Sequence, residues 1–199
     1  MSMNRKAKRK VVLVDLDSTI VDLLGPWLAT YNETCGDNLL VEELTTFETH
    51  EHARHGNRVY EPFAIPGFFA DLPSLPGAIE AVKRLHEKAE VVIVTSAPTH
   101  PQVMGDKAVW VKKHLPFLCG LHNFVVTGAK YLIHGDVLID DAPRYAEAYK
   151  ERHPKAFVTG ILFPYNQQHE RHFDLLAPDW KNTEKAWDLI LSEVMPRLK

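Results

Sequence analysis

The chain has few cysteines, only Cys35 and Cys119 among its 199 residues. Two cysteines do not make a disulfide framework, so we expect both to be reduced and the protein to be cytoplasmic. No apolar run approaches the roughly 20 residues that a membrane-spanning helix needs, and we therefore expect no association with a membrane. The formal net charge of −3 provides no overall positive field, so no nucleic acid is expected as a partner.

The sequence also lacks internal repeats and low-complexity linkers, which indicates one domain or a core with a small inserted subdomain. Its hydrophobic content of 45% and charged content of 25% are ordinary for a soluble globular protein. The first residues, MSMNRKAKRK, are basic, and they contain no apolar segment before the first predicted strand, unlike a secretory signal. We interpret residues 1–9 as a solvated, disordered basic tail, with a nucleic-acid or targeting role as the less favoured alternative.

Apolar runs alternate with helical patterns along most of the chain. The strand-like runs are residues 11–16, 90–95, 124–127, 137–139 and 156–163. The helical patterns are residues 76–87, 106–115, 142–150 and 183–195. This alternation predicts the α/β class, with a parallel sheet covered by helices on both faces.

One stretch, residues 22–72, interrupts the alternation because it has no strong strand signal. We predict a mostly helical cap here, inserted after the first strand, with residues 10–21 and 73–199 forming the core. A cap at this point in the chain would lie over a site at the end of the first strand, where it could exclude water and select the substrate. Core packing explains most of its aromatic side chains, which are Trp27, Tyr31, Phe47, Tyr60, Phe63, Phe68 and Phe69.

Polar side chains follow or lie near several of the predicted strands. The carboxyl ends of parallel strands meet at one edge of a sheet, where open α/β folds bind their ligands, so these side chains can converge. A carboxylate can attack phosphorus, magnesium can offset the charge repulsion, and lysine and hydroxyl groups can stabilise the phosphoryl oxygens. The candidates are Asp15 and Asp17, Thr95 and Ser96, Lys130, and Asp140 and Asp141.

Each of these features alone has an ordinary structural explanation. Asp-x-Asp occurs in helix caps, turns and calcium loops, and Thr-Ser after a strand is often a helix N-cap. Lys130 alone would be a surface lysine, and Asp140 with Asp141 could cap the following helix. Their conjunction, in this order and each near an apolar run, favours magnesium-assisted phosphoryl transfer.

With these motifs in this order, the sequence resembles the haloacid dehalogenase superfamily. Within that superfamily it is most similar to the 5'(3')-deoxyribonucleotidases, from about residue 10 to residue 191. The similarity is carried by residues 68–85, 91–98, 107–115 and 136–143, and by the ten-residue step from Lys130 to Asp140. The resemblance implies a Rossmann-like core, with a central parallel sheet flanked by helices, and a small helical cap.

The resemblance also implies a role for each catalytic residue. Asp15 would be the nucleophile, and Asp17 would be the general acid and base. Thr95 and Ser96 would bind the phosphoryl oxygens, while Lys130 would pair with both the phosphate and Asp15.

The implied cofactor is Mg²⁺, held by Asp15, Asp17, Asp140 and Asp141, and which of the last two binds it directly stays open. Asp17 would also offer its backbone carbonyl. An aromatic clamp for the nucleobase is expected from the cap. Phe63 falls where the family has an aromatic residue, and Phe47 is a looser match.

Four positions depart from the family pattern. Ser18 and Thr19 follow the second aspartate, where a glycine and an apolar residue are frequent. Leu23 stands where a base-stacking phenylalanine is expected, and Ala142 stands where an arginine is common. These departures leave the phosphatase chemistry intact but leave the preference for a deoxynucleotide, and for a base, open.

The sequence therefore predicts a magnesium-dependent phosphomonoesterase that removes phosphate from (deoxy)nucleoside monophosphates through an aspartyl-phosphate intermediate. The alternative is a related phosphatase acting on another small phosphate ester or on a polynucleotide end. A signalling receiver domain fits less well, because receivers carry the acidic pair early and the phosphoacceptor on a middle strand. An inactive binding protein has no support, since every expected polar group is present. The oligomeric state, a homodimer included, stays open.

Eleven histidines raise the question of zinc. His50, His52 and His55 lie close together in the sequence, as do His169 and His172, and a zinc site would use such spacing. Neither group has cysteine partners or a second matching pair. We therefore interpret them as solvated residues of the cap and loops.

Overall fold

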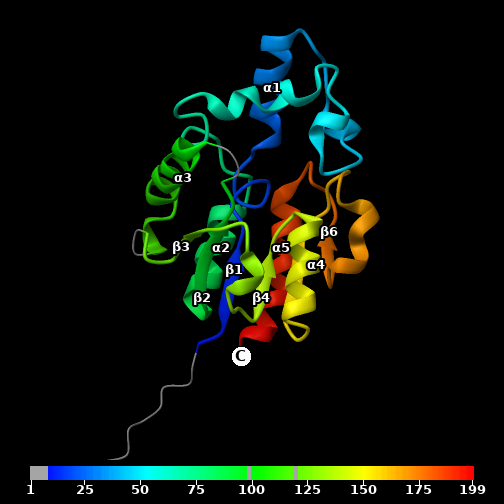
Figure 1. Ribbon diagram of the computed structural model, residues 1–199. Helices are drawn as coiled ribbons and strands as arrows, with labels where there is room; N and C mark the ends of the chain where they lie inside the picture. Colours follow the sequence, from blue (N-terminus) through cyan, green and yellow to red (C-terminus); the bar gives the residue numbers. More distant parts are fainter. Residues whose placement is uncertain (1–8, 98–99, 119–120) are drawn as a thin grey trace, which may run out of the picture.

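Six parallel strands form a single sheet in the computed structural model, which describes residues 9–97, 100–118 and 121–199. The strand order is β3-β2-β1-β4-β5-β6, so the order reverses beside β1 (Figure 1). This confirms the predicted Rossmann-like parallel sheet and places its switch point between β1 and β4. The strands are β1 (Val11–Val14), β2 (Glu90–Thr95), β3 (Phe124–Val126), β4 (Val137–Ile139), β5 (Phe157–Ile161) and β6 (Leu175–Ala177).

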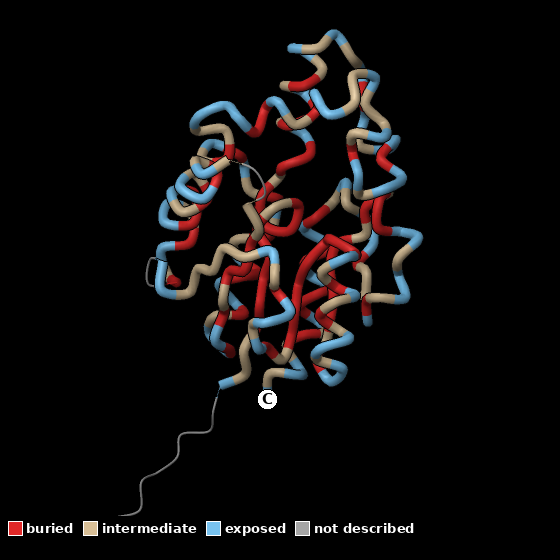
Figure 2. Tube along the Cα trace, viewed as in Figure 1, coloured by how far each residue is buried: buried red, intermediate tan, exposed pale blue. Residues whose placement is uncertain are grey.

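Helices cover both faces of the sheet because the strands are apolar on both faces. Val12 and Val14 pack into one core together with α2 (Ala78–Lys88) and α5 (Thr183–Val194). Leu13, which points the other way, packs into a second core with α4 (Pro143–Arg152). Figure 2 shows that the central strands β1, β4 and β5 are almost continuously buried. The sheet is therefore enclosed, and its strand ends are the exposed places where a site can form.

Several elements differ from the sequence prediction at their ends. The strand β6 was not predicted, because Leu175–Ala177 is an edge strand too short to show a period. The strand β5 ends at Ile161 instead of residue 163. The helix α3 (Pro101–His114) begins five residues earlier than expected, with a proline in its first turn. Gly105 lowers the helix propensity of those first residues, which explains why the predicted helix began at residue 106.

Residues 22–72 contain α1 (Leu24–Cys35) and three 3₁₀ helices, η1 (Val41–Glu43), η2 (Thr49–Glu51) and η3 (Gly56–Ala64), and no strand. In Figure 1 this segment lies beyond the carboxyl ends of the strands. Trp27 of α1 donates from Nε1 to the Val59 carbonyl oxygen, which fixes α1 to η3. The division of the chain into a core and a cap stays a prediction.

Part of the predicted basic tail, residues 1–8, and Cys119 lie outside the described residues. Arg9, the last residue of that tail, donates to the carbonyl oxygens of His86 and Ala89 at 2.6 and 2.8 Å. Arg9 is thus joined to the end of α2. In the part of the chain that the structure describes, no helix is both long and apolar enough to cross a membrane. The expected cytoplasmic location and the open oligomeric state stay predictions.

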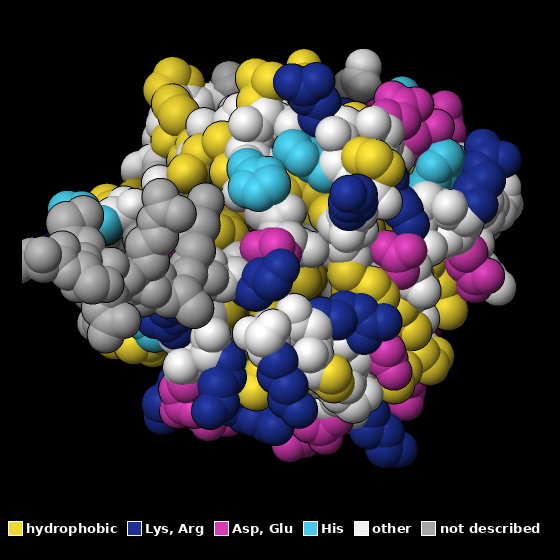
Figure 3. All heavy atoms as spheres, turned by 90° about the horizontal axis from the view of Figure 1, so that it is seen from below, with side chains coloured by type: hydrophobic (Ala, Val, Ile, Leu, Met, Phe, Trp, Pro, Cys, Tyr) yellow, Lys and Arg dark blue, Asp and Glu magenta, His cyan; other side chains and the backbone are white. Residues whose placement is uncertain are grey.

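Charges of both signs lie side by side at the end of the molecule opposite α1 (Figure 3). Near the amino ends of the strands, Lys10 pairs with Asp136 at 2.8 Å, and Lys150 pairs with Asp174 at 2.6 Å. These pairs place carboxylates directly beside the lysines. The expectation that nucleic acid is not a partner stays a prediction.

Candidate active site

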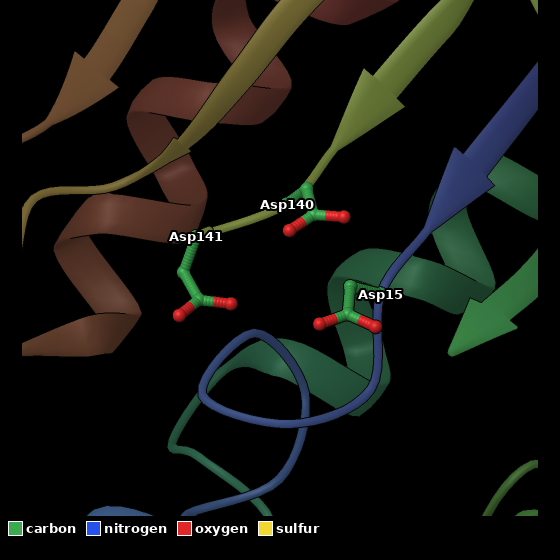
Figure 4. A group of neighbouring side chains, drawn as sticks. All are labelled: Asp15, Asp140 and Asp141. Carbon is green, nitrogen blue, oxygen red and sulfur yellow. The ribbon is translucent and has the colours of Figure 1, made fainter. Parts of the chain in front are cut away.

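Asp15 and Asp140 are the first residues after two neighbouring strands, β1 and β4. The backbone N–H of Asp15 donates to the Ile139 carbonyl at 2.8 Å, and that of Asp140 donates to the Thr159 carbonyl at 2.9 Å. Sheet hydrogen bonding therefore continues into the site and fixes both residues. With Asp141 they form a buried cluster in which one carboxylate oxygen from each lies within 4.8 Å of the others. Figure 4 shows the three carboxylates facing one common space.

Gly160 of β5 makes this arrangement possible. A Cβ at position 160 would lie 2.2 Å from the carbonyl oxygen of Asp140, closer than any real contact of that kind. Only glycine therefore lets β5 come this close to the end of β4. No sequence motif pointed to Gly160, because a single glycine inside a strand does not indicate which part of the chain approaches it.

Lys130 is a fully buried cation between two of the carboxylates. Its ammonium lies 2.7 Å from Oδ1 of Asp15 and 2.6 Å from Oδ2 of Asp140. Burial lowers the pKa of Lys130, but the charges of Asp140 and Asp15 outweigh it and raise that pKa above its usual value. The two carboxylates therefore favour the protonated form of Lys130, which the structure places beside Asp15.

One ammonium does not balance three buried carboxylates. Burial raises the pKa of Asp140 to about 6, although the charge of Lys130 opposes the rise. Burial, followed by the charges of Asp140 and Asp15, raises the pKa of Asp141 well above its ordinary value. This excess of negative charge means that an added cation would stabilise the ionised cluster.

Asp17 pairs with a lysine that the sequence analysis missed. The ammonium of Lys107, from α3, contacts the Asp17 carboxylate and lies 3.1 Å from Oγ1 of Thr95. Burial raises the pKa of Asp17, and the charge of Lys107 opposes the rise. The signal for Lys107 was its place between Val103 and Val111, as a charged residue in the buried stripe of α3.

The two predicted phosphate ligands occupy different positions. Ser96 lines a cavity of about 460 Å³ above the acidic cluster, together with Asp15, Asp17 and Asp141. Thr95 is fully buried, and its hydroxyl accepts a hydrogen bond from Lys107. Thr95 therefore lies behind the cavity wall, whereas Ser96 faces the cavity.

Aromatic side chains from residues 22–72 line the other end of this cavity. Both predicted clamp residues, Phe47 and Phe63, are among them. The Phe63 ring lies 4.6 Å from that of Trp27, and the Phe47 ring lies 5.6 Å from that of Tyr165. Leu23, which stands where the family pattern has a base-stacking phenylalanine, also lines the cavity. The cavity thus joins a charged end to an aromatic end.

Arg144 brings a cation to the cavity wall, from two residues beyond the position where an arginine was expected. Its guanidinium lies 5.2 Å from the ring centre of Phe47 and 4.8 Å from that of Tyr145. Ala142, at the expected position, is buried and donates its backbone N–H to Oδ1 of Asp140 at 3.0 Å. The first turn of α4 therefore holds Asp140 and carries Arg144 to the cavity.

The histidine groups form no candidate metal site among the described residues, where Asp15, Asp140 and Asp141 are the only such cluster. His169 and His172 stack on each other at 5.9 Å. His52 contacts the hydroxyl of Thr46 at 3.0 Å. These three histidines are half-buried and not fully solvated as expected, and His169 and His172 belong to the 3₁₀ helix η6 (Gln167–His172).

Comparisons with known proteins identify the family. The family described as "5' nucleotidase, deoxy (Pyrimidine), cytosolic type C protein" matches residues 9–194. A protein of Staphylococcus epidermidis is 34% identical over 184 residues, which are 92% of this chain and 98% of the relative. The 5'(3')-deoxyribonucleotidase of Bacillus subtilis is 29% identical over 180 residues, 89% of this chain and 98% of that protein.

The fold has relatives among solved structures. A haloacid dehalogenase-like hydrolase of Streptococcus pneumoniae superposes with a TM-score of 0.62 at 10% identity, covering 93% of this chain and 98% of that one. At such low identity the superposition shows the fold alone. The family match extends over both the strands that carry the acidic cluster and the segment that lines the aromatic end of the cavity. The chain therefore belongs to the deoxyribonucleotidase family of haloacid dehalogenase-like hydrolases.

Proposed function

We propose that the protein is a magnesium-dependent phosphomonoesterase that removes phosphate from deoxynucleoside monophosphates. Its family makes it a phosphoric monoester hydrolase. The observation that carries the finer proposal is the buried cluster of Asp15, Lys130, Asp140 and Asp141, which opens into an aromatic cavity. The cluster supplies an attacking group and a cation site, and the cavity suits a nucleoside.

The acidic cluster has the donors that Mg²⁺ prefers, because all three side chains offer carboxylate oxygens. Asp140 already accepts hydrogen bonds from Lys130 and from the backbone of Ala142, one on each oxygen. Asp141 accepts from Tyr165 on Oδ2, and no donor among the described residues reaches its Oδ1. This pattern favours Asp141 over Asp140 as a direct Mg²⁺ ligand. Asp15 and the backbone carbonyl of Asp17 would be the other two ligands that the protein supplies. When bound, Mg²⁺ would neutralise charge between the carboxylates and the phosphate.

Asp15 is the nucleophile in this proposal. Its carboxylate follows β1 directly, and the ion pair with Lys130 fixes its orientation. An oxygen of Asp15 attacks phosphorus, the bond to the ester oxygen breaks, and an aspartyl-phosphate forms. Lys130 and Ser96 then stabilise the phosphoryl oxygens as charge redistributes.

Asp17 is the general acid and base. Its raised pKa favours the protonated form that can donate to the leaving alkoxide. In the second step the same carboxylate takes a proton from water, which attacks the aspartyl-phosphate and frees Asp15. Lys107, in contact with Asp17, holds that carboxylate toward the cavity.

The aromatic end of the cavity supports a nucleoside as the leaving group. Flat rings such as Phe47, Tyr60 and Phe63 can stack on a nucleobase and exclude water. The alternatives are another small phosphate ester, which would leave this surface unused, and a polynucleotide end, which would need a path out of the cavity.

A substrate panel separates these possibilities. We expect dTMP and dUMP to have a higher kcat/KM than p-nitrophenyl phosphate, and a 5'-phosphorylated oligonucleotide to be a poorer substrate than either nucleotide. Phe47→Leu should lower kcat/KM for the nucleotides while leaving p-nitrophenyl phosphate little changed. Equal turnover of dTMP and p-nitrophenyl phosphate would remove the nucleotide from the proposal.

A further inference from the structure

Tyr165 is a buried side chain beside the acidic cluster that no sequence motif indicated. Its hydroxyl donates to Oδ2 of Asp141, and the residue is only 4% exposed. The next residue, Asn166, donates from Nδ2 to the backbone carbonyl of Asp141 at 2.9 Å. Two consecutive residues after β5 therefore hold Asp141, one by its side chain and one by its main chain.

Both of these residues are themselves fixed. Asn166 is fully buried, accepts the backbone N–H of Phe163 at 2.9 Å, and donates to the Ile161 carbonyl at 2.9 Å. The Tyr165 ring stacks on Phe163 with centres 5.3 Å apart and planes 8° apart, and it meets the edge of Phe47 at 5.6 Å. The Tyr165 hydroxyl is therefore a donor in one fixed place.

A fixed donor on one oxygen of a carboxylate sets the direction of the other oxygen. With Oδ2 of Asp141 directed to Tyr165, Oδ1 can face the space shared with Asp15 and Asp140 (Figure 4). Without that hydrogen bond the Asp141 side chain can rotate, and it must be ordered again whenever a cation binds. Partners that orient a metal ligand in this way typically change metal affinity 10- to 100-fold.

We infer that Tyr165 is a positioning residue, whose hydroxyl orients Asp141 for Mg²⁺. The inference rests on the proposed function, because it takes Asp141 as a magnesium ligand. Tyr165 lines the cavity, but its hydroxyl is directed to Asp141 and it makes no hydrogen bond to Asp15 or Asp17. Its effect should therefore appear in the magnesium affinity and not in the turnover of the magnesium-saturated enzyme.

The test measures the binding of Mg²⁺ alone to the full, metal-free chain by isothermal titration calorimetry. Tyr165→Phe keeps the ring and its aromatic neighbours and removes only the hydroxyl. We expect its Kd for Mg²⁺ to rise 10- to 100-fold. Tyr149→Phe is the matched control, because Tyr149 is a buried tyrosine of the second core that donates to the Gly135 carbonyl. Its Kd should equal that of the wild type.

A second readout separates positioning from general damage. Raised Mg²⁺ should restore Tyr165→Phe to the wild-type kcat, with a correspondingly higher Mg²⁺ requirement. A wild-type Kd in folded Tyr165→Phe overturns the inference and leaves the proposed function intact. A rate loss that Mg²⁺ does not restore also overturns it. Mg²⁺ binding by Asp141→Asn tests the metal site itself. If this variant binds Mg²⁺ with the wild-type Kd, Asp141 is not a ligand, and both the proposed metal site and the inference about Tyr165 are wrong.

Discussion

At the scale of single residues, the site works by placing charges where they would be costly without partners. Lys130 has no exposed surface, yet it is charged because two carboxylates lie within 3 Å of its ammonium. Asp17 has a corresponding partner in Lys107. The sequence identified Lys130 because it lies ten residues before Asp140, in the pattern of a known family. It missed Lys107, although this lysine lies in the buried stripe of α3 between Val103 and Val111, because no family motif pointed to it.

The pair of Asp17 and Lys107 predicts how activity depends on pH. A general acid must be protonated, so kcat/KM should fall as pH rises through the pKa of Asp17, which burial raises. Lys107 lowers that pKa, so Lys107→Met should move the falling limb of the profile to higher pH. Lys112→Met, an exposed change on the same helix, should leave the profile in place. A limb that stays fixed or moves to lower pH in Lys107→Met contradicts the assignment of Asp17.

At the scale of elements, alternation of apolar runs and helical patterns was enough to predict a parallel α/β sheet. The five predicted strands are present because buried parallel strands are nearly continuous apolar runs, a strong signal. The strand β6 and the first turn of α3 were missed, because a three-residue edge strand and a glycine-containing turn carry little periodicity. The hydrogen bonds from Tyr165 and Asn166 to Asp141 depend on the path of the chain after β5. No local sequence pattern specifies that path.

The prediction at this scale concerns Gly160, which lets β5 lie close to the end of β4. Gly160→Ala inserts a methyl group 2.2 Å from the Asp140 carbonyl, so β4 and β5 must separate. We expect a stability loss of about 1–3 kcal/mol, typical of overpacking, and a larger proportional loss of kcat because Asp140 moves. Denaturant unfolding and steady-state kinetics measure the two effects. Gly105→Ala serves as the control, since nothing lies within 4 Å of a Cβ at that position. Gly160→Ala with wild-type stability and rate would show that the close approach has no role.

At the scale of the whole molecule, the acidic cluster should make stability depend on pH and on a bound cation. The pKa of Asp140 is about 6 in the folded protein, against an ordinary value of 3.8. Between these values the folded state binds more protons than the unfolded state, so the metal-free protein should lose stability as pH rises through this range. Ligands that bind only the folded state restore stability.

The corresponding prediction is that Mg²⁺ raises the melting temperature more at pH 7 than at pH 4.5, because at pH 7 the cluster is ionised and can bind the cation. Thermal unfolding with and without chelator measures the difference. Exhaustive chelation should also abolish hydrolysis, and added Mg²⁺ should restore it. Full activity in excess chelator would exclude the metal from the mechanism.

The most direct test of the central claim, that Asp15 attacks phosphorus, is the hydrolysis of dTMP by Asp15→Asn. An amide of the same shape cannot replace the attacking carboxylate, so kcat should fall by more than about a thousandfold while circular dichroism shows a folded protein. Wild-type enzyme quenched with acid during turnover should carry phosphate on Asp15, detected by mass spectrometry of its peptides. A folded Asp15→Asn variant that retains substantial turnover would contradict the account.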